Sequence, residues 1–149
     1  MHDDERRRLL DQIVAWSGNE LACRPTHRQV SSAEVGALGQ GKLIEVGSHT
    51  ATHPWLSALP TASQRDEILR SKTELEKMLG HSVRSFAYPH GDFNADTVRI
   101  VREAGFACAC SSIVDMVHPR TDRFQLPRMV VQNWDGEEFS KQLSKWFRI

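Results

Sequence analysis

Apolar residues recur at helical spacing in several long stretches of the chain. In the first of these, Leu9, Leu10 and Ile13 fall on one face of a helix that has acidic residues in its first turn. The same period, read together with the signals that start and stop helices, predicts helices over residues 4–16, 31–39, 61–79, 94–104 and 136–147.

Compact apolar runs lie between these helices and predict strands. The runs cover residues 43–47, 83–88, 106–110 and 126–131. Because helices and strands alternate along the chain, the pattern indicates an α/β fold built from βαβ units with a parallel sheet. Four strands are few for a closed (β/α) barrel, which needs about eight. A barrel-like fold is therefore expected to be incomplete here, or to close against another chain.

Short polar patterns indicate where individual helices begin and end. Residues 31–34 (SSAE) and 61–64 (TASQ) each have the form of a capping box. Asn94 is placed to cap the helix that follows it, and Gly80 to end the preceding one.

Composition and charge limit the class of protein. The chain of 149 residues suits one domain, with a helical lead-in over residues 1–41 and a βα core over residues 42–149. Its 19 basic and 19 acidic residues cancel, which argues against nucleic acid as a partner. Neither a membrane-spanning apolar stretch nor a secretion signal is visible, so a cytoplasmic location is expected. Cys108 and Cys110 would share one strand face, and we interpret both as structural, buried groups.

A pair of histidines follows the first predicted strand. His49 and His53 lie in residues 48–54 (SHTATHP), and side chains four residues apart share a face if the segment makes one helical turn. Pro54 should keep that turn brief. Neutral imidazoles at this spacing can bind one divalent metal ion. Since the chain has seven histidines, the pattern also fits two solvated side chains on a helix surface.

A second polar cluster follows the next predicted strand, so in a parallel sheet it should lie beside the histidines. Here Tyr88, Pro89, His90 and Gly91 form the sequence YPHG. Tyr88 could line a sugar site, and the N–H groups of the turn could steady an oxyanion. The alternative is an ordinary tight turn that ends a strand.

Together these clusters resemble the polysaccharide deacetylase family, the carbohydrate esterases with the NodB homology domain. The likeness runs from about Leu43 to Val131 and rests on four segments in the family's order, which are residues 45–54 (EVGSHTATHP), 86–91 (FAYPHG), 104–106 (AGF) and 126–128 (LPR).

This resemblance implies a partial (β/α) barrel of the deacetylase type and hydrolysis of N- or O-acetyl groups on a polysaccharide. It implies a divalent metal ion, commonly zinc, bound by His49 and His53, and an acetylated glycan bound near residues 88–91 and Arg128.

The sequence departs from the family's pattern where the pattern supplies carboxylates. The family's first motif, a strand ending in two aspartates that serve as metal ligand and general base, has no counterpart; Asp3 and Asp4 open a predicted helix instead. A late histidine that acts as general acid in the family is also missing from residues 126–131. Asp92, close to His90 in sequence, is the candidate for a substitute carboxylate.

Two functional interpretations remain open. The chain is either a deacetylase whose turnover is weak or lost without the Asp-Asp motif, or a non-catalytic carbohydrate-binding or dimerising remnant of one. In both cases an incomplete barrel exposes a sheet edge, so self-association into a homo-oligomer is expected.

Overall fold

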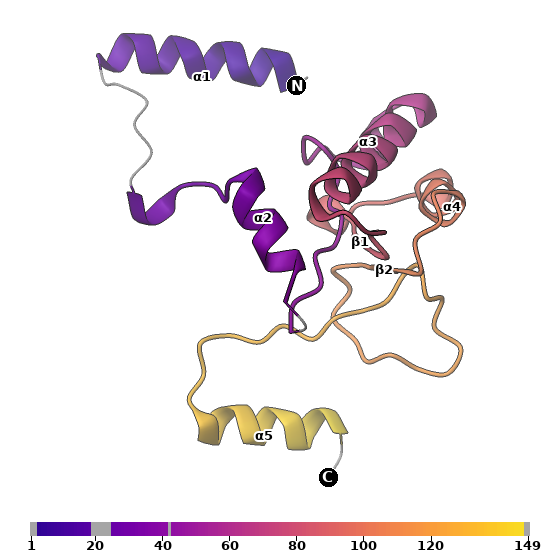
Figure 1. The fold of residues 1–149 in the computed structure, drawn as a ribbon. Coiled ribbons are helices and arrows are strands. Elements are labelled where there is room, and N and C mark those ends of the chain that lie inside the picture. The colour runs from indigo at the N-terminus through magenta and orange to yellow at the C-terminus, as the bar shows by residue number, and fades with distance from the viewer. Residues whose placement is uncertain (1–2, 19–24, 42, 148–149) are drawn as a thin grey trace.

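The computed structural model describes residues 3–18, 25–41 and 43–147. Along the chain, the helices are α1 (Asp3–Ser17), α2 (Ser32–Gly39), α3 (Thr61–Leu79), α4 (Ala95–Glu103) and α5 (Gly136–Phe147). Short 3-10 helices lie at η1 (Pro25–His27), η2 (Leu56–Ala58) and η3 (Pro89–Gly91), and the strands are β1 (Ser85–Ala87) and β2 (Cys108–Cys110). Each of the predicted helices is present in this order (Figure 1).

The sheet is parallel, as the alternation of elements predicts. β1 pairs with β2, with Phe86 opposite Ala109. Single parallel bridges join Ser48 to Phe86 and Cys110 to Leu126, so four segments of chain lie side by side in the order 48, β1, β2, 126.

The expected strands at residues 43–47 and 126–131 are wrong as continuous strands. Among the described residues, the first segment makes no bridge, since pairing occurs only at Ser48 just after it, and the second makes a single bridge, at Leu126. Both segments lie at outer edges of the sheet, and several of their apolar side chains are exposed to solvent. Ile44 is 53% exposed and Val131 is 59% exposed. A strand is stabilised by pairing and burial on its neighbours, and within the described residues these two segments have a sheet neighbour on one side only.

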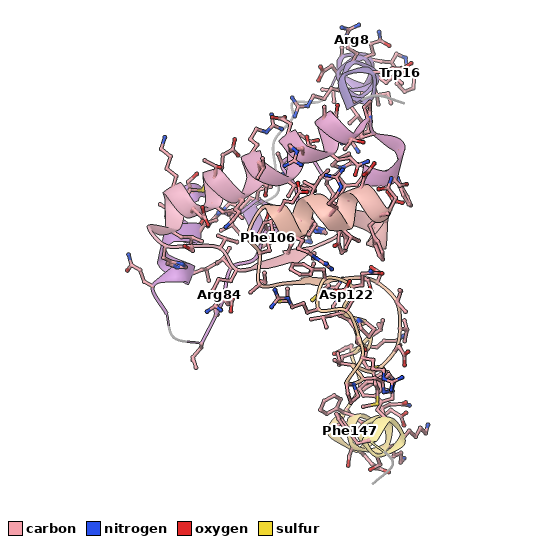
Figure 2. The ribbon with its side chains drawn as sticks, turned by 90° about the vertical axis from the view of Figure 1, so that its right-hand side faces the viewer. Arg8, Trp16, Arg84, Phe106, Asp122 and Phe147 are labelled. Carbon is pink, nitrogen blue, oxygen red and sulfur yellow. The ribbon has the colours of Figure 1, made fainter. Side chains whose placement is uncertain are left out.

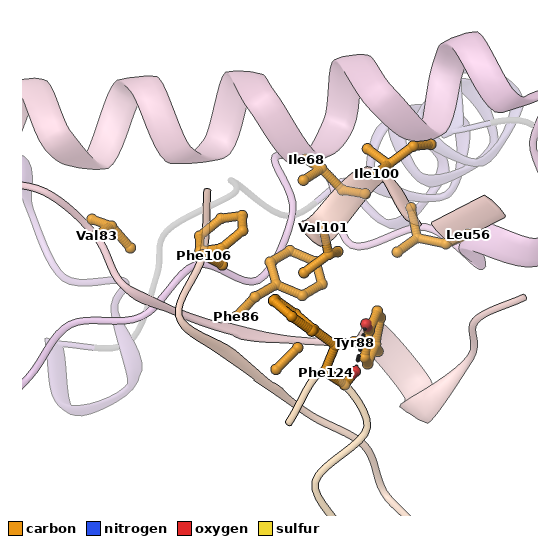
Figure 3. Close-up of a cluster of buried hydrophobic side chains, with 10 residues drawn as sticks. Leu56, Ile68, Val83, Phe86, Tyr88, Ile100, Val101, Phe106 and Phe124 are labelled. Carbon is orange, nitrogen blue, oxygen red and sulfur yellow. Dashed lines mark hydrogen bonds between the residues drawn. The ribbon is translucent and has the colours of Figure 1, made fainter. Parts of the chain in front are cut away.

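Helices α3 and α4 cover one face of the sheet, and the core lies between these helices and the sheet (Figures 1 and 3). Phe86 and Ala109, which are register partners on neighbouring strands, both point into this core. The buried apolar residues are Leu56, Ile68, Val83, Phe86, Tyr88, Ile100, Val101, Phe106, Ala109 and Phe124.

The two cysteines of β2 share a face, but it is the face opposite Ala109. Both cysteines are free and only half-buried, so the expectation that they are buried is wrong. Ala109, the residue between them, lies in the core.

Local capping explains several of the helix boundaries. Ser31 and Glu34 form the predicted capping box of α2, and Asn94 caps α4 in the same way with Thr97. The capping box expected at residues 61–64 does not form. Pro60 is the N-cap of α3, and the Thr61 hydroxyl instead donates to Asp96 Oδ2 on α4 over 3.1 Å.

Helices α1 and α5 lie away from this core. Trp16 and Arg8 mark α1 at one extremity and Phe147 marks α5 at the other, with Phe106 between them (Figure 2). The apolar face predicted for α1 is present but largely uncovered, since Leu9, Leu10 and Ile13 are exposed. In the part of the chain that the structure describes, no helix is long and apolar enough to cross a membrane.

Candidate active site

The two polar clusters lie next to each other at one end of the sheet. Ser48 N donates to Ser85 O and Ala87 N donates to Ser48 O, each over 2.9 Å. This pairing places the loop of residues 49–54 beside the turn of residues 88–92 that follows β1. The expected neighbourhood of the two clusters is therefore confirmed.

Three histidines from these two loops make ring contacts in series. The ring centroids of His49 and His53 are 4.8 Å apart, and those of His53 and His90 are 4.4 Å apart. Both pairs meet edge to face. His53 therefore lies between an imidazole of its own loop and one from the turn after β1.

The loop that holds the histidine pair is bent and not helical, so the expected helical turn is wrong. Thr50 and His53 take left-handed backbone conformations, with φ of 66° and 60°. Such conformations are costly for residues other than glycine and cluster at functional sites. Here the bends, and not a helical period, bring the two rings together.

His49 is oriented by the backbone of β1. Its Nδ1 lies 2.7 Å from Ala87 O, and because a carbonyl oxygen only accepts, Nδ1 carries the proton. The lone pair of the neutral ring is then on Nε2, the arrangement found in metal-binding histidines whose other nitrogen donates to a carbonyl.

The surroundings of His53 favour its neutral form. Desolvation by neighbouring protein atoms lowers the pKa of His53, and the nearby His49 and His90 lower that pKa further. A neutral imidazole is the form that binds a metal ion.

Sequence reasoning missed a buried carboxylate that holds the histidine loop from α3. Glu67 Oε2 accepts hydrogen bonds from Ala51 N (3.0 Å) and Thr52 N (2.8 Å), and Glu67 Oε1 accepts one from the Thr52 hydroxyl (2.9 Å). A signal for it exists in the sequence. Glu67 adjoins Ile68 on the buried stripe of α3, where a charged side chain needs a specific partner.

The side chain of Tyr88 belongs to the core. It is 1% exposed, and its hydroxyl donates to Phe124 O over 2.8 Å (Figure 3). The expectation that Tyr88 presents its face to a sugar is therefore not met, because the phenol ring packs on Phe86 and Phe93. Pro89 is buried as well.

Backbone N–H groups that were expected to face an oxyanion instead form hydrogen bonds within the turn of residues 89–91. Gly91 N donates to Tyr88 O, and Asp92 N donates to Pro89 O. This turn lies against the segment after β2, since a Cβ on Gly91 would come within 2.5 Å of Ser112 Cβ. Arg128 adjoins that segment through a 2.8 Å hydrogen bond from its Nε to Ser111 O.

Asp92 is engaged with the other loop. Its carboxylate accepts hydrogen bonds from Ser57 N over 2.7 Å and from the Ser57 hydroxyl over 2.6 Å. Both carboxylate oxygens of Asp92 thus hold η2 to the turn after β1. The structure therefore gives no support to the prediction that Asp92 replaces the missing catalytic carboxylate.

His49 and His53 fit two positions of a metal site in donor type and proximity, and His49 fits in tautomer as well. Across residues 3–18, 25–41 and 43–147, however, no group of three His, Cys, Asp or Glu side chains is arranged to hold a metal ion. The described residues therefore supply part of such a site and not a complete one.

A parallel α/β core whose polar loops gather after Ser48 and β1 is typical of (β/α)-barrel hydrolases. The profile of the polysaccharide deacetylase family matches residues 26–109, more than half of the chain. The chain belongs to the polysaccharide deacetylase family.

Solved structures agree on the fold. The chain is similar to BC0361, a polysaccharide deacetylase from Bacillus cereus (TM-score 0.68, 19% identity), over 91% of this chain and 47% of that one. It is similar to IcaB from Ammonifex degensii (TM-score 0.68, 23% identity), over 85% of this chain and 56% of that one. It also resembles the Streptococcus pyogenes deacetylase PplD (TM-score 0.60, 20% identity), over 72% of this chain and 54% of that one. The fold is thus a partial (β/α) barrel of the deacetylase type.

Among curated proteins, an uncharacterised protein from Streptomyces coelicolor is 36% identical over 58 residues, which are 39% of this chain and 23% of that protein. The chain spans about a quarter of this relative and about half of the solved deacetylases.

Proposed function

We propose that this chain carries the histidine half of a metal-dependent active site that removes N- or O-acetyl groups from a polysaccharide. The observation that supports this most is the orientation of His49, whose Nδ1–H donates to Ala87 O while the His53 ring lies 4.8 Å away. Imidazole rings held in this way can bind a divalent ion through their unprotonated nitrogens, and zinc accepts such ligands readily.

The metal ion, when bound, would polarise the acetyl carbonyl and acidify a water molecule. The residues of this chain have simpler tasks. His49 and His53 would hold the ion, Glu67 fixes the loop that carries them, and the ring of His90 contacts that of His53.

A second function, glycan binding without turnover, is favoured by a separate observation. No carboxylate joins the histidines to make a metal site in the described residues, and Asp92 is held by Ser57. Without a general base, acetate release is expected to be weak or undetectable.

Metal content tests the first part of the proposal. The parent chain and a His49→Ala, His53→Ala double variant are dialysed against zinc and analysed by plasma mass spectrometry, with His118→Ala as the control because His118 is exposed and lies outside both loops. The parent and the control should retain zinc and the double variant should lose it. Equal zinc in all three contradicts the assignment of the ligands.

Acetate release then separates the two functions. The zinc-loaded chain is incubated with acetylated chito-oligosaccharides and with an aryl acetate, and free acetate is measured. Release that disappears in the double histidine variant supports turnover. Glycan binding without release supports the non-catalytic alternative. If robust release survives Asp92→Asn, the chain uses another general base.

A further inference from the structure

Trp55 is an exposed aromatic side chain at the edge of the candidate site. Trp55 is 57% exposed although its indole stacks on the imidazole of His90, with ring centroids 4.2 Å apart and ring planes within 7° of parallel. Because His90 covers one face of the indole, the exposure is concentrated on the rest of that ring.

The stack is held in place by residues on both sides of it. Leu56, the next residue, is fully buried, and Ser57 donates two hydrogen bonds to Asp92, two residues after His90. The loop that carries Trp55 and the turn that carries His90 are thereby tied together. A ligand that packs on a side chain held in this way loses little of its binding energy to ordering the protein.

Trp55 is also connected to the histidine pair by a series of ring contacts. Its ring contacts His90, His90 contacts His53, and His53 contacts His49, so four rings follow one another across the two loops. The exposed face of Trp55 is at the outer end of this row, so a sugar ring on it would border the histidine cluster, with the rings of Trp55 and His90 between it and His53.

The chemistry around Trp55 favours a sugar over an apolar partner. The apolar neighbour Leu56 is buried, while His53, Ser57 and His90 are polar and exposed. A single aromatic face with a polar rim matches a pyranose ring, whose C–H groups form an apolar face and whose hydroxyl groups form a polar edge.

Trp16 provides a contrast within the same chain. It is 88% exposed, but it belongs to helix α1, on which Leu10 and Ile13 are more than half exposed as well. That surface is a broad apolar helix face, which suits a protein partner and not a sugar ring.

We propose that the exposed face of Trp55 is a glycan subsite that binds a pyranose ring of the acetylated polysaccharide next to the histidine cluster. This assignment rests on the proposed function for its substrate class, and it names the residue that holds the sugar chain in place.

Titration calorimetry with an N-acetylglucosamine pentamer tests the assignment on the full chain. The parent is compared with Trp55→Ala, Trp55→Phe and Trp16→Ala. Trp55→Ala should weaken binding about tenfold or more, the loss expected when one aromatic stacking contact is removed. Trp55→Phe should retain part of the affinity and Trp16→Ala all of it. Unchanged thermal unfolding in each variant shows that the effect is local.

Equal binding by the parent and Trp55→Ala, an equal loss in Trp16→Ala, or no binding by the parent overturns the subsite. The proposed metal site fails by a different result, namely zinc retention that does not depend on His49 and His53. Pentamer binding that depends on Trp55 together with that result keeps the subsite and removes the metal-site proposal.

Discussion

Glu67 on α3 holds Thr52 of the histidine loop by two hydrogen bonds, 2.8 Å from the Thr52 amide and 2.9 Å from its hydroxyl. Glu67 as a whole residue is 9% exposed and lies on the buried side of α3. Its contacts end one residue before His53. Glu67 is therefore a positioning residue for the proposed metal ligands and not a ligand itself.

Glu67→Gln should weaken zinc binding and lower stability. The amide oxygen of glutamine can replace one acceptor, but its NH₂ group would face backbone or hydroxyl donors. We expect a loss of about 10–100-fold in zinc affinity, as for other changes behind metal-binding histidines. We also expect about 1–3 kcal/mol lower free energy of unfolding from unpaired buried groups. Competition with a zinc chelator and urea unfolding measure the two effects. Glu74→Gln, an exposed glutamate of the same helix, is the control. Zinc affinity equal to that of the control contradicts the positioning role.

Gly91 allows close packing of the turn after β1, and Gly80 provides a control with a similar backbone conformation and no close neighbour. Both have left-handed φ, 69° and 74°, but a Cβ on Gly91 would meet Ser112 at 2.5 Å whereas one on Gly80 would meet nothing within 4 Å. Gly80→Ala should cost about 1–2 kcal/mol for its backbone conformation alone. Gly91→Ala should cost that amount and about 1–3 kcal/mol more for overlap. Chemical unfolding of the two variants gives the difference, and equal losses contradict the close approach of Gly91 to Ser112.

The ionisation of Tyr88 can be measured without interference from other tyrosines, since it is the one tyrosine in the sequence. Burial raises the pKa of Tyr88 well above the ordinary value of 10.0, and nearby Asp122 adds to that rise. A raised folded-state pKa contributes stability below the unfolded value, and this stability is lost as the pH rises toward the folded value. Alkaline titration followed by near-ultraviolet absorbance should therefore show no phenolate in the folded chain at pH near 10, while the urea-unfolded chain ionises there. Coincident titration curves contradict the burial of Tyr88.

Self-association follows from the two sheet edges and remains a proposal. The segments at Ile44 and Val131 border the sheet on opposite sides with exposed apolar side chains. Exposed edges of this kind favour pairing with another chain. Light scattering should give a mass above that of one chain, and an Ile44→Lys, Val131→Lys variant should move it toward the monomer. Val117→Lys, equally exposed in the loop after β2, is the control. A parent of monomeric mass, or a double variant of unchanged mass, contradicts the proposal.

The sequence by itself determined the helices and the nature of the fold. Their boundaries depend on signals within a few residues, such as Asn94 at the start of α4 and Gly80 after α3, so a local pattern suffices to find them. The parallel pairing of β1 with β2 and the adjacency of the two polar clusters followed from the alternation of helix and strand.

Only the tertiary structure decided how these elements are used. Residues 43–47 and 126–131 have strand-like sequences, but the first segment is followed by a single bridge at Ser48 and the second makes one at Leu126, because pairing depends on neighbours that are distant in sequence. Tyr88 lies in the core because Phe124, 36 residues later, accepts its hydrogen bond. The histidine segment lies beside the turn after β1, as expected, but it does not form the expected helical turn. Its shape is fixed by the hydrogen bonds to Glu67 and by the left-handed backbone conformations of Thr50 and His53. Contacts between distant residues leave little local signal, which is why the sequence indicated His49, His53 and His90 but neither the support from Glu67 nor the geometry of the site.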